Sequence, residues 1–143
     1  MLFRSMYNRA LAGKEKALGA EHTSTLTTVN HLGDLYAGQG RVKDAEKMFN
    51  RALAGYEKAL GAEHTSTLTT VNNLGALYTR QGRVKDAEIM YNRALAGKEK
   101  TLGAEHTSTL TTVNNLGILY AGQGHLKDAE IMFNRALAGK QKS

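Results

Sequence analysis

The chain repeats itself with a period of 42 residues, and this feature limits its fold more than any other. Residues 22–63 and 64–105 differ at eight of their forty-two aligned positions. A third copy begins at His106 and runs to Ser143, and residues 1–21 match the second half of such a unit. Self-similarity at a fixed period predicts an array of repeated structural units. The predicted segments are 1–21, 22–63, 64–105 and 106–143.

Each full unit contains two stretches of apolar residues at steps of three and four, a spacing that places them on one face of an α-helix. In residues 22–63 the first stretch comprises Leu26, Val29, Leu32, Gly33 and Tyr36. The second comprises Val42, Ala45, Met48, Phe49, Ala52, Leu53 and Leu60. A short segment with two glycines, 38–40, lies between them and predicts a tight turn between antiparallel helices. We call residues 24–38 and their equivalents the A helices, and residues 42–60 and their equivalents the B helices.

Neither helix of a pair buries its apolar face alone, so successive pairs are expected to stack. The sequence therefore predicts an all-α fold, an α-solenoid of antiparallel pairs with about seven helices. Gly33 and its equivalents predict a close approach of the B helix, because glycine destabilises a helix by roughly 1 kcal/mol relative to alanine. Gly55 and its equivalents predict a bend or a weak point in the B helix. A hydroxyl of Thr65 or Ser66 is expected to cap the next A helix.

Composition excludes several classes of protein. The chain has no cysteine, so it forms neither a disulfide nor a thiolate metal site. No apolar run approaches the ~20 residues of a membrane-spanning helix, and the first residues lack the apolar core of a secretory signal. We expect a cytoplasmic protein without a membrane segment.

No arrangement of residues predicts catalysis, a metal site or a bound cofactor. His22, His64 and His106 each follow a glutamate, but they recur one repeat apart. Helix layers about 10 Å apart cannot share a metal ion bound at ~2 Å, so a loop or helix-capping role is expected for these histidines. The motif GxxxxGK followed by Ser or Thr is absent, and every candidate for a Ser-His-Asp set occurs in triplicate. We expect a protein that is not an enzyme and binds no cofactor.

The second full unit resembles the tetratricopeptide repeat, with its pattern of Leu-Gly, Tyr, Gly, Ala, an aromatic residue and Ala-Leu. The matching residues are Leu74, Gly75, Tyr78, Gly82, Ala87, Tyr91, Ala94 and Leu95. The 42-residue period and the linker LGAEHTST are similar to the kinesin light chain and nephrocystin-3 branch of that family. That branch usually has proline after the histidine, where this chain has Thr23, Thr65 and Thr107, so the departure implies more fraying at the helix starts.

The near identity of the copies, with the segments LTTVNNLG and RALAGYEKALG, is most similar to the C-terminal repeat arrays of fungal NOD-like receptors. In those proteins a nucleotide-binding NACHT domain precedes the array, and the array is thought to sense a ligand. The resemblance implies a right-handed superhelix whose A helices line a concave groove. It also implies that this groove binds a protein or an extended peptide.

The A-helix residues that point away from the apolar face form the candidate peptide-binding groove. They are Thr27, Asn30, His31, Asp34, Thr69, Asn72, Asn73, Arg80, Thr111, Asn114 and Asn115, with Ala37, Ala76, Thr79, Ile118 and Ala121 beside them. Three of the eight differences between the first two full units fall on this surface and a fourth, Gly38/Arg80, lies at its edge. This distribution favours a binding role.

A row of asparagines, Asn30, Asn72 and Asn114, recurs on the same surface. An amide both donates and accepts hydrogen bonds, so such a row can bind the main chain of an extended peptide. The same side chains can instead bond each other or neighbouring backbone and keep the repeats in register. The sequence leaves both roles open.

Charge placement separates the classes of partner. The A helices contain two charged residues, Asp34 and Arg80, so they offer no paired cations for a peptide carboxylate. All other charge, including the excess behind the net charge of +6, lies on the B helices and turns, where basic and acidic residues are interleaved. Such a mixed face indicates ordinary solvation, and nucleic acid is not an expected partner.

Two functions remain open from the sequence. In the first, the chain is a module that binds a protein or an extended peptide. In the second, it is a structural spacer or a self-association scaffold whose groove holds no ligand. The first and last B helices lack an A-helix neighbour in this sequence, so we expect identical chains to associate through these ends.

Overall fold

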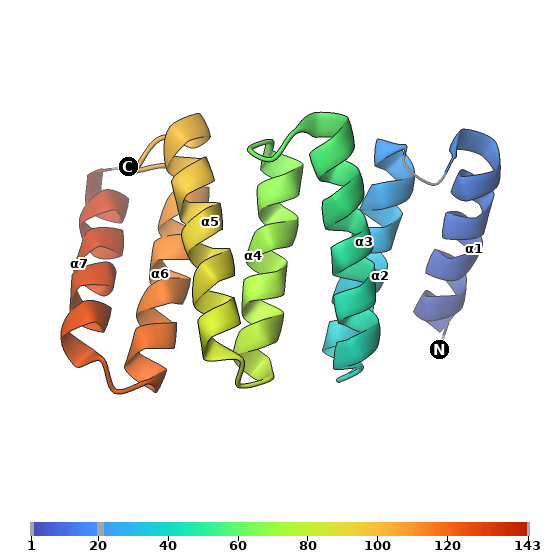
Figure 1. Cartoon of the computed structure of the whole chain (residues 1–143). Helices are drawn as coiled ribbons and strands as arrows, with labels where there is room; N and C mark the ends of the chain where they lie inside the picture. The colour runs from blue at the N-terminus through green and yellow to red at the C-terminus, as the bar shows by residue number, and fades with distance from the viewer. Residues whose placement is uncertain (1, 20–21, 143) are drawn as a thin grey trace. The chain divides into compact units, whose positions relative to one another are not determined.

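The computed structural model describes residues 2–19 and 22–142, with the side chains of residues 6–19 and 22–140. Met1, Ala20, Glu21 and Ser143, which belong to the predicted first and last segments, lie outside the described residues. The described chain is all-α, as predicted, and contains seven helices (Figure 1). They are α1 (Leu2–Leu18), α2 (Thr23–Gly38), α3 (Val42–Leu60), α4 (Thr65–Arg80), α5 (Val84–Leu102), α6 (Thr107–Gly122) and α7 (Leu126–Lys142).

The helices form two compact units, Met1–Asn73 and Leu74–Ser143. In the first unit α2 packs against both α1 and α3, and in the second unit α6 packs against both α5 and α7. Within each unit, neighbouring helices run in opposite directions (Figure 1). The prediction of antiparallel helix pairs is therefore confirmed, with α2, α4 and α6 as the A helices and the other four as B helices.

Within each pair, the A and B helices meet at a glycine. A Cβ atom placed on Gly33 of α2 would lie 2.6 Å from the ring of Phe49 on α3. The Phe49 side chain is only 1% exposed, so the ring has no room to move away. The same contact joins Gly75 to Tyr91 and Gly117 to Phe133. The predicted close approach at these glycines is confirmed.

Gly55 lies at a second close contact between an A helix and a B helix. Helix α3 runs from Val42 to Leu60 as one α-helix through this position. A Cβ atom placed on Gly55 would lie 2.5 Å from Leu26 Cδ2, and Leu26 is 1% exposed. Gly55 therefore also has a packing role that the sequence analysis did not predict, because the missing side chain makes room for a buried leucine of the A helix.

A histidine, not a hydroxyl, caps the start of the A helices. His22 precedes α2, and its Nδ1 atom accepts a hydrogen bond of 3.1 Å from the backbone N–H of Ser24. His64 and His106 accept the same bond from the residues two positions later. The bond satisfies one of the N–H groups that a helix start leaves without a partner. The expected capping role of the three histidines is confirmed.

The expected capping by Thr65 or Ser66 was wrong, because both residues lie inside α4. A hydroxyl is nevertheless used nearby. Helix α3 ends at Leu60, and the next residue, Gly61, has a φ of 97° that favours glycine. The hydroxyl of the buried Thr67 donates to the carbonyl of Gly61 at 2.8 Å. This bond fixes the link between α3 and α4 in the first unit.

Gly55→Ala is expected to lower the free energy of unfolding by about 1 kcal/mol. Overpacking a buried contact costs about 1–3 kcal/mol, and the better helix propensity of alanine offsets only about 1 kcal/mol of it. Gly13 holds the same register position in α1 but has nothing within 4 Å of its Cβ position. Gly13→Ala is therefore the matched control and should stabilise by about 0.5–1 kcal/mol. Urea unfolding followed by circular dichroism measures both, and equal stabilisation would contradict the packing role of Gly55.

Candidate partner-binding surface

One face of each A helix stays largely exposed. On α2 this face comprises Thr27, His31, Asp34 and Gly38, at steps of four, three and four residues. These steps place all four on one side of the helix. We call these residues and their equivalents the A-helix stripe. The equivalents are Thr69, Asn73, Ala76 and Arg80 on α4, and Thr111, Asn115, Ile118 and Gly122 on α6.

The three A helices differ from one another only on or beside the A-helix stripe. Helices α2, α4 and α6 have 16 residues each and are identical except at positions 31, 34, 37 and 38 of α2 and their equivalents. None of these positions is buried in any copy. At one position the three copies carry Asp34, Ala76 and Ile118, so an acid, a small residue and a large apolar residue occupy equivalent sites.

The asparagine row lies beside the stripe and is half-buried. In the first unit the Oδ1 atom of Asn30 accepts a hydrogen bond of 3.0 Å from the Thr70 hydroxyl, which joins α2 to α4. Asn72 also has an interaction partner. For Asn114 the structure gives no side-chain hydrogen bond among the described residues. At Asn30, therefore, the amide contributes to the register of the helices.

The threonines of the stripe are exposed, but their hydroxyl groups already have partners. The Thr27 hydroxyl donates to the Thr23 carbonyl at 2.9 Å and accepts from the Tyr56 hydroxyl at 2.9 Å. Thr69 and Thr111 donate to the carbonyls four residues before them. A ligand on the stripe would thus meet threonine methyl groups and oxygen lone pairs more readily than free donors.

The stripe of α2 has the one carboxylate found on the A helices, Asp34. Burial raises the pKa of Asp34 above its ordinary value, and the charge of His31 one turn away partly opposes this shift. The His31 ring also lies beside the Tyr7 ring of α1, with 6.0 Å between ring centroids and an interplanar angle of 53°. In the first unit, an acidic side chain and two aromatic rings therefore lie together at the stripe.

The sequence profile of the tetratricopeptide repeat family matches residues 4–58, 28–100 and 66–142. The chain belongs to the tetratricopeptide repeat family. Such repeats generally mediate protein interactions, and arrays of them are typically not catalytic.

Solved structures place this tetratricopeptide repeat chain close to kinesin light chain arrays, as its sequence predicted. BtubC (BKLC) from P. vanneervenii superposes with a TM-score of 0.90 at 25% identity, over 97% of this chain and 56% of that one. The chain thus spans little more than half of BtubC. A putative kinesin light chain from Podospora anserina with nearly identical TPR-like repeats gives a TM-score of 0.79 at 27% identity, over 97% and 66% of the two chains.

A variant of the Podospora anserina protein gives a TM-score of 0.81 at 27% identity, over 98% of this chain and 68% of that one. A comparison with curated proteins finds no match.

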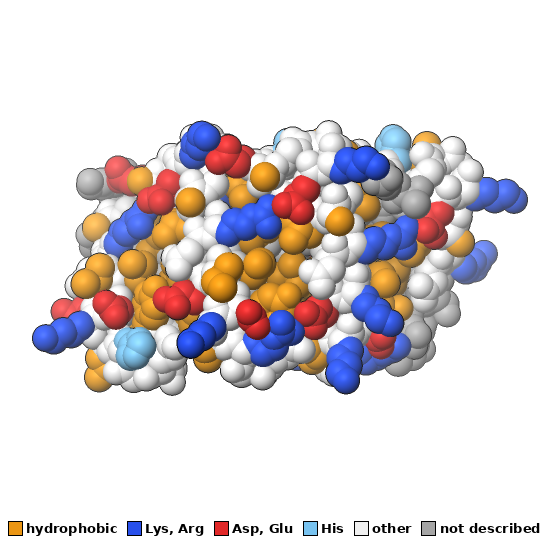
Figure 2. Space-filling view, in the orientation of Figure 1, with side chains coloured by type: hydrophobic (Ala, Val, Ile, Leu, Met, Phe, Trp, Pro, Cys, Tyr) orange, Lys and Arg blue, Asp and Glu red, His pale blue; other side chains and the backbone are white. Residues whose placement is uncertain are grey.

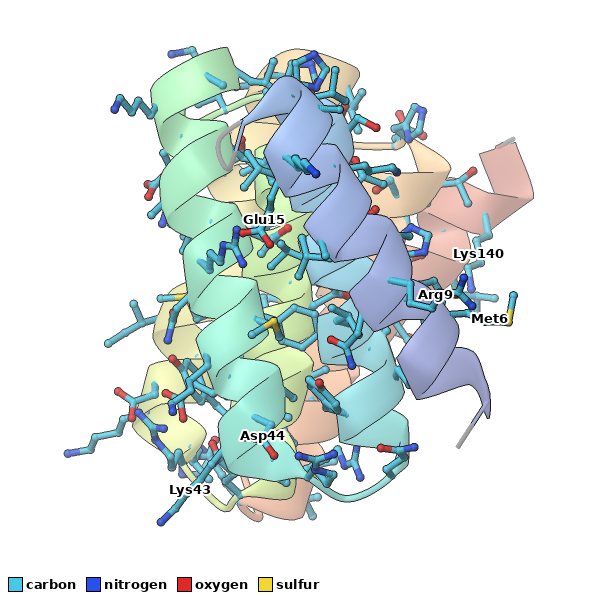
Figure 3. All side chains as sticks on the ribbon, turned by 90° about the vertical axis from the view of Figure 1, so that its right-hand side faces the viewer. Met6, Arg9, Glu15, Lys43, Asp44 and Lys140 are labelled. Atoms are coloured by element: carbon cyan, nitrogen blue, oxygen red, sulfur yellow. The ribbon has the colours of Figure 1, made fainter. Side chains whose placement is uncertain are left out.

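The B-helix face of this tetratricopeptide repeat chain has charges of both signs. Figure 2 shows Lys and Arg side chains interleaved with Asp and Glu on this face. Some of them form ion pairs between successive B helices. In the first unit Arg51 pairs with Glu15 at 2.5 Å, and Glu15 points from α1 toward α3 (Figure 3). Arg135 and Glu99 form the equivalent pair in the second unit. None of the described helices is long and apolar enough to span a membrane.

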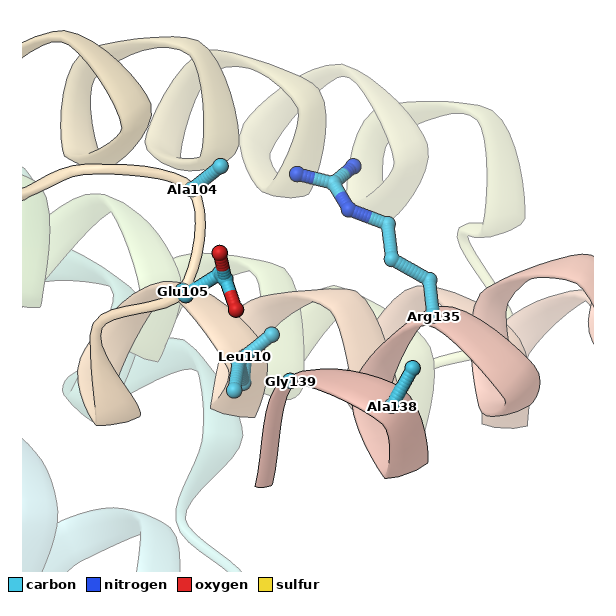
Figure 4. A pocket seen from close by; sticks show the side chains of 6 residues that line it. All are labelled: Ala104, Glu105, Leu110, Arg135, Ala138 and Gly139. Atoms are coloured by element: carbon cyan, nitrogen blue, oxygen red, sulfur yellow. The ribbon is translucent and has the colours of Figure 1, made fainter. Parts of the chain in front are cut away.

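A small pocket of about 220 Å³ opens beside the last pair of helices in the second unit (Figure 4). It is lined by Ala104, Glu105, Leu110, Arg135, Ala138 and Gly139. Its volume is below the roughly 300–1,000 Å³ typical of sites for small ligands. Its cation, Arg135, is already paired with Glu99. In the part of the chain that the structure describes, no three His, Asp or Glu side chains are grouped to hold a metal ion.

Lys98 is a site that the sequence analysis missed. It is 5% exposed, and its Nζ atom donates to the Thr112 hydroxyl at 2.9 Å and to the Ser108 carbonyl at 3.3 Å. Burial lowers the pKa of Lys98 from its ordinary value. A buried amine of this kind is a candidate nucleophile. Here, however, it lies in the contact between α5 and α6, and Lys14 makes the same bond to Thr28 between α1 and α2. The arrangement indicates a structural joint.

Lys98 should make the stability of the chain rise with pH in the alkaline range. Burial lowers the pKa of Lys98 in the folded state from its ordinary value of 10.5. Between the folded-state pKa and 10.5, the unfolded chain therefore binds more protons than the folded chain. Stability therefore increases as pH rises through this interval, and Lys98→Met should remove that increase. Urea unfolding at about pH 7 and about pH 10 measures it, with the exposed Lys85→Met as the control. An unchanged pH dependence in Lys98→Met would refute the assignment.

Proposed function

We propose that the chain is a non-enzymatic binding module that holds a protein or an extended peptide on the A-helix stripe. The distribution of differences among the three A helices is the observation that carries this proposal. All buried positions of these helices are identical, whereas the stripe carries Asp34, Ala76 and Ile118 at one register position. Packing accounts for the identity of the core, but it does not account for an acid replacing an apolar residue on the surface.

The chemistry of the stripe favours a partner with little net charge. It consists mainly of threonine methyl groups, amides and small residues, with Asp34 in the first unit and Arg80 in the second. Amides and hydroxyl oxygens suit the main chain of an extended segment, whose N–H and C=O groups need partners of both kinds. The positions that differ among the copies would then select individual side chains.

We also propose the biological context that the resemblance implies. The array would be the ligand-sensing part of a fungal NOD-like receptor, located in the cytoplasm. The segments LTTVNNLG and RALAGYEKALG support this proposal. The complete gene tests it, because an adjoining NACHT domain would support the receptor and a kinesin-type region would overturn it.

Substitution on the stripe should abolish partner binding without changing the fold. Peptides of about twelve residues are first selected from a random displayed library on the immobilised chain, and their affinities are measured by calorimetry. Ala76→Arg with Ile118→Arg should weaken binding at least about tenfold, since bulky cations then occupy the stripe positions of the second unit. Ala54→Arg with Ala96→Arg, at exposed B-helix positions, is the control and should have no effect. Equal losses in both variants would locate the site elsewhere.

The second candidate function, a structural spacer or self-association scaffold, is favoured by two observations. Asn30 bonds Thr70 and so contributes to helix register. In addition, Phe133 and Leu137 of α7 are exposed, whereas their equivalents in α5, Tyr91 and Leu95, are buried. Exposed apolar side chains of this size can bury themselves against a second copy of the chain.

The two roles of the asparagine row can be separated by a matched pair of substitutions. Asn30→Ala should lower the free energy of unfolding by about 1 kcal/mol, because the Thr70 hydroxyl loses its acceptor at 3.0 Å and keeps only the longer contact of 3.3 Å to the Ser66 carbonyl. Asn114→Ala, at the same register position, should cost little stability. If the row also binds a partner, Asn114→Ala weakens the selected peptides in the calorimetric assay. Normal peptide affinity in both variants would leave the row with a purely structural role.

A further inference from the structure

One arrangement of side chains joins α2 to α3 in the first unit, and it recurs between α4 and α5. In the first unit the guanidinium of Arg41 lies over the Tyr36 ring, with Cζ 4.6 Å from the ring centroid. The same guanidinium pairs with Asp44 through Nη2 at 2.6 Å, and Asp44 lies in the first turn of α3 (Figure 3). Tyr36 is consequently only 7% exposed. A tyrosine ring and a carboxylate thus hold one arginine between them.

The second unit repeats this arrangement with Tyr78, Arg83 and Asp86. The Arg83 guanidinium lies 4.1 Å from the Tyr78 ring centroid, and its Nε atom is 3.0 Å from Asp86 Oδ2. A planar cation suits this position, because it stacks on the ring face while it donates to the carboxylate. In both copies, therefore, the tyrosine ring and the aspartate together bind a guanidinium group.

In the third copy His125 takes the place of the arginine. Tyr120 and Asp128 are in their usual positions, at the end of α6 and in the first turn of α7. The turn has the same backbone hydrogen bond, from the N–H of His125 to the Tyr120 carbonyl at 2.9 Å; the corresponding bond of Arg83 is 2.8 Å. Among the described residues no ion pair to Asp128 is found, and Tyr120 is more exposed than Tyr78.

A second carboxylate lies beside the same ring. The side chains of Glu88 and Asn92, both on α5, lie close enough to the Tyr120 hydroxyl to shift its pKa. Burial raises the pKa of this hydroxyl, and Glu88 and Asp128 add to the shift through their negative charges. Two acidic side chains, one on α5 and one on α7, therefore lie near the Tyr120 hydroxyl.

We propose that Tyr120, Asp128 and Glu88 form a binding site for the arginine side chain of a partner polypeptide. The incoming guanidinium takes the position that Arg41 and Arg83 occupy in the other two copies. It stacks on the Tyr120 ring and donates to the Asp128 carboxylate, while Glu88 adds attraction from α5. The site lies at the junction of α6 and α7 and shares no residue with the A-helix stripe, so it does not depend on the function proposed above.

The test uses acetyl-arginine amide as the probe and follows its binding by NMR on the isotope-labelled chain. Saturable shifts are expected at Tyr120, His125 and Asp128. Acetyl-lysine amide should bind about two- to fivefold more weakly, because an ammonium lacks the planar stack, whose attraction is worth about 0.5–1 kcal/mol at an exposed site. The citrulline analogue, which is isosteric but neutral, should not saturate.

Two reciprocal substitutions make the test decisive. His125→Arg installs the residue that the chain already uses at positions 41 and 83, so it should fold normally and lose the shifts. Arg83→His should open a second site, with new shifts at Tyr78 and Asp86. Absence of saturable shifts in the unsubstituted chain, or unchanged binding in His125→Arg, would overturn the proposal.

Discussion

The contact between an A-helix glycine and a B-helix aromatic ring is the constraint on which the rest of the structure depends. At Gly33 the helix backbone itself forms the surface that the Phe49 ring packs against, because a Cβ atom there would overlap the ring. The two helices of a pair can therefore approach this closely only because residue 33 has no Cβ atom. The opposite side of each A helix is left exposed, and this side carries the stripe.

The joints between pairs are less uniform than the pairs themselves. Lys14 and Lys98 each donate to a threonine of the following A helix, while the same register position in α3 holds Tyr56. A buried ammonium without a carboxylate is costly, and hydrogen bonds to Thr112 and Ser108 offset part of that cost. A tyrosine hydroxyl at this position introduces no charge. The chain thus uses two solutions, one charged and one neutral, for the same position.

The sequence predicted the features that depend on periodicity, and it missed those that depend on a single distant partner. The helix bounds and the close approach at Gly33 follow from local spacing. For the capping histidines the sequence indicated only a loop or helix-capping role. The capping hydrogen bond itself was assigned to the hydroxyl residues next to them, because hydroxyl residues are the commoner caps. The partner of Asn30 is Thr70, forty residues away, and no local pattern indicates which of its possible bonds it makes. The packing role of Gly55 was missed for the same reason, since it depends on the position of Leu26.

Because the repeats are nearly identical, the effect of a residue that differs can be seen by comparing equivalent positions in the three copies. Tyr36 and Tyr78 are each covered by an arginine of their own turn, so these rings take part only in internal contacts. Tyr120 has the same backbone around it and lacks that arginine, because the chain carries His125 there. An internal cation held by a ring and a carboxylate loses little entropy on binding, since it is already tethered. Replacing it by histidine exposes the same pair of groups to an external cation. A change of one residue in a turn can in this way convert a structural contact into a recognition site without disturbing the core.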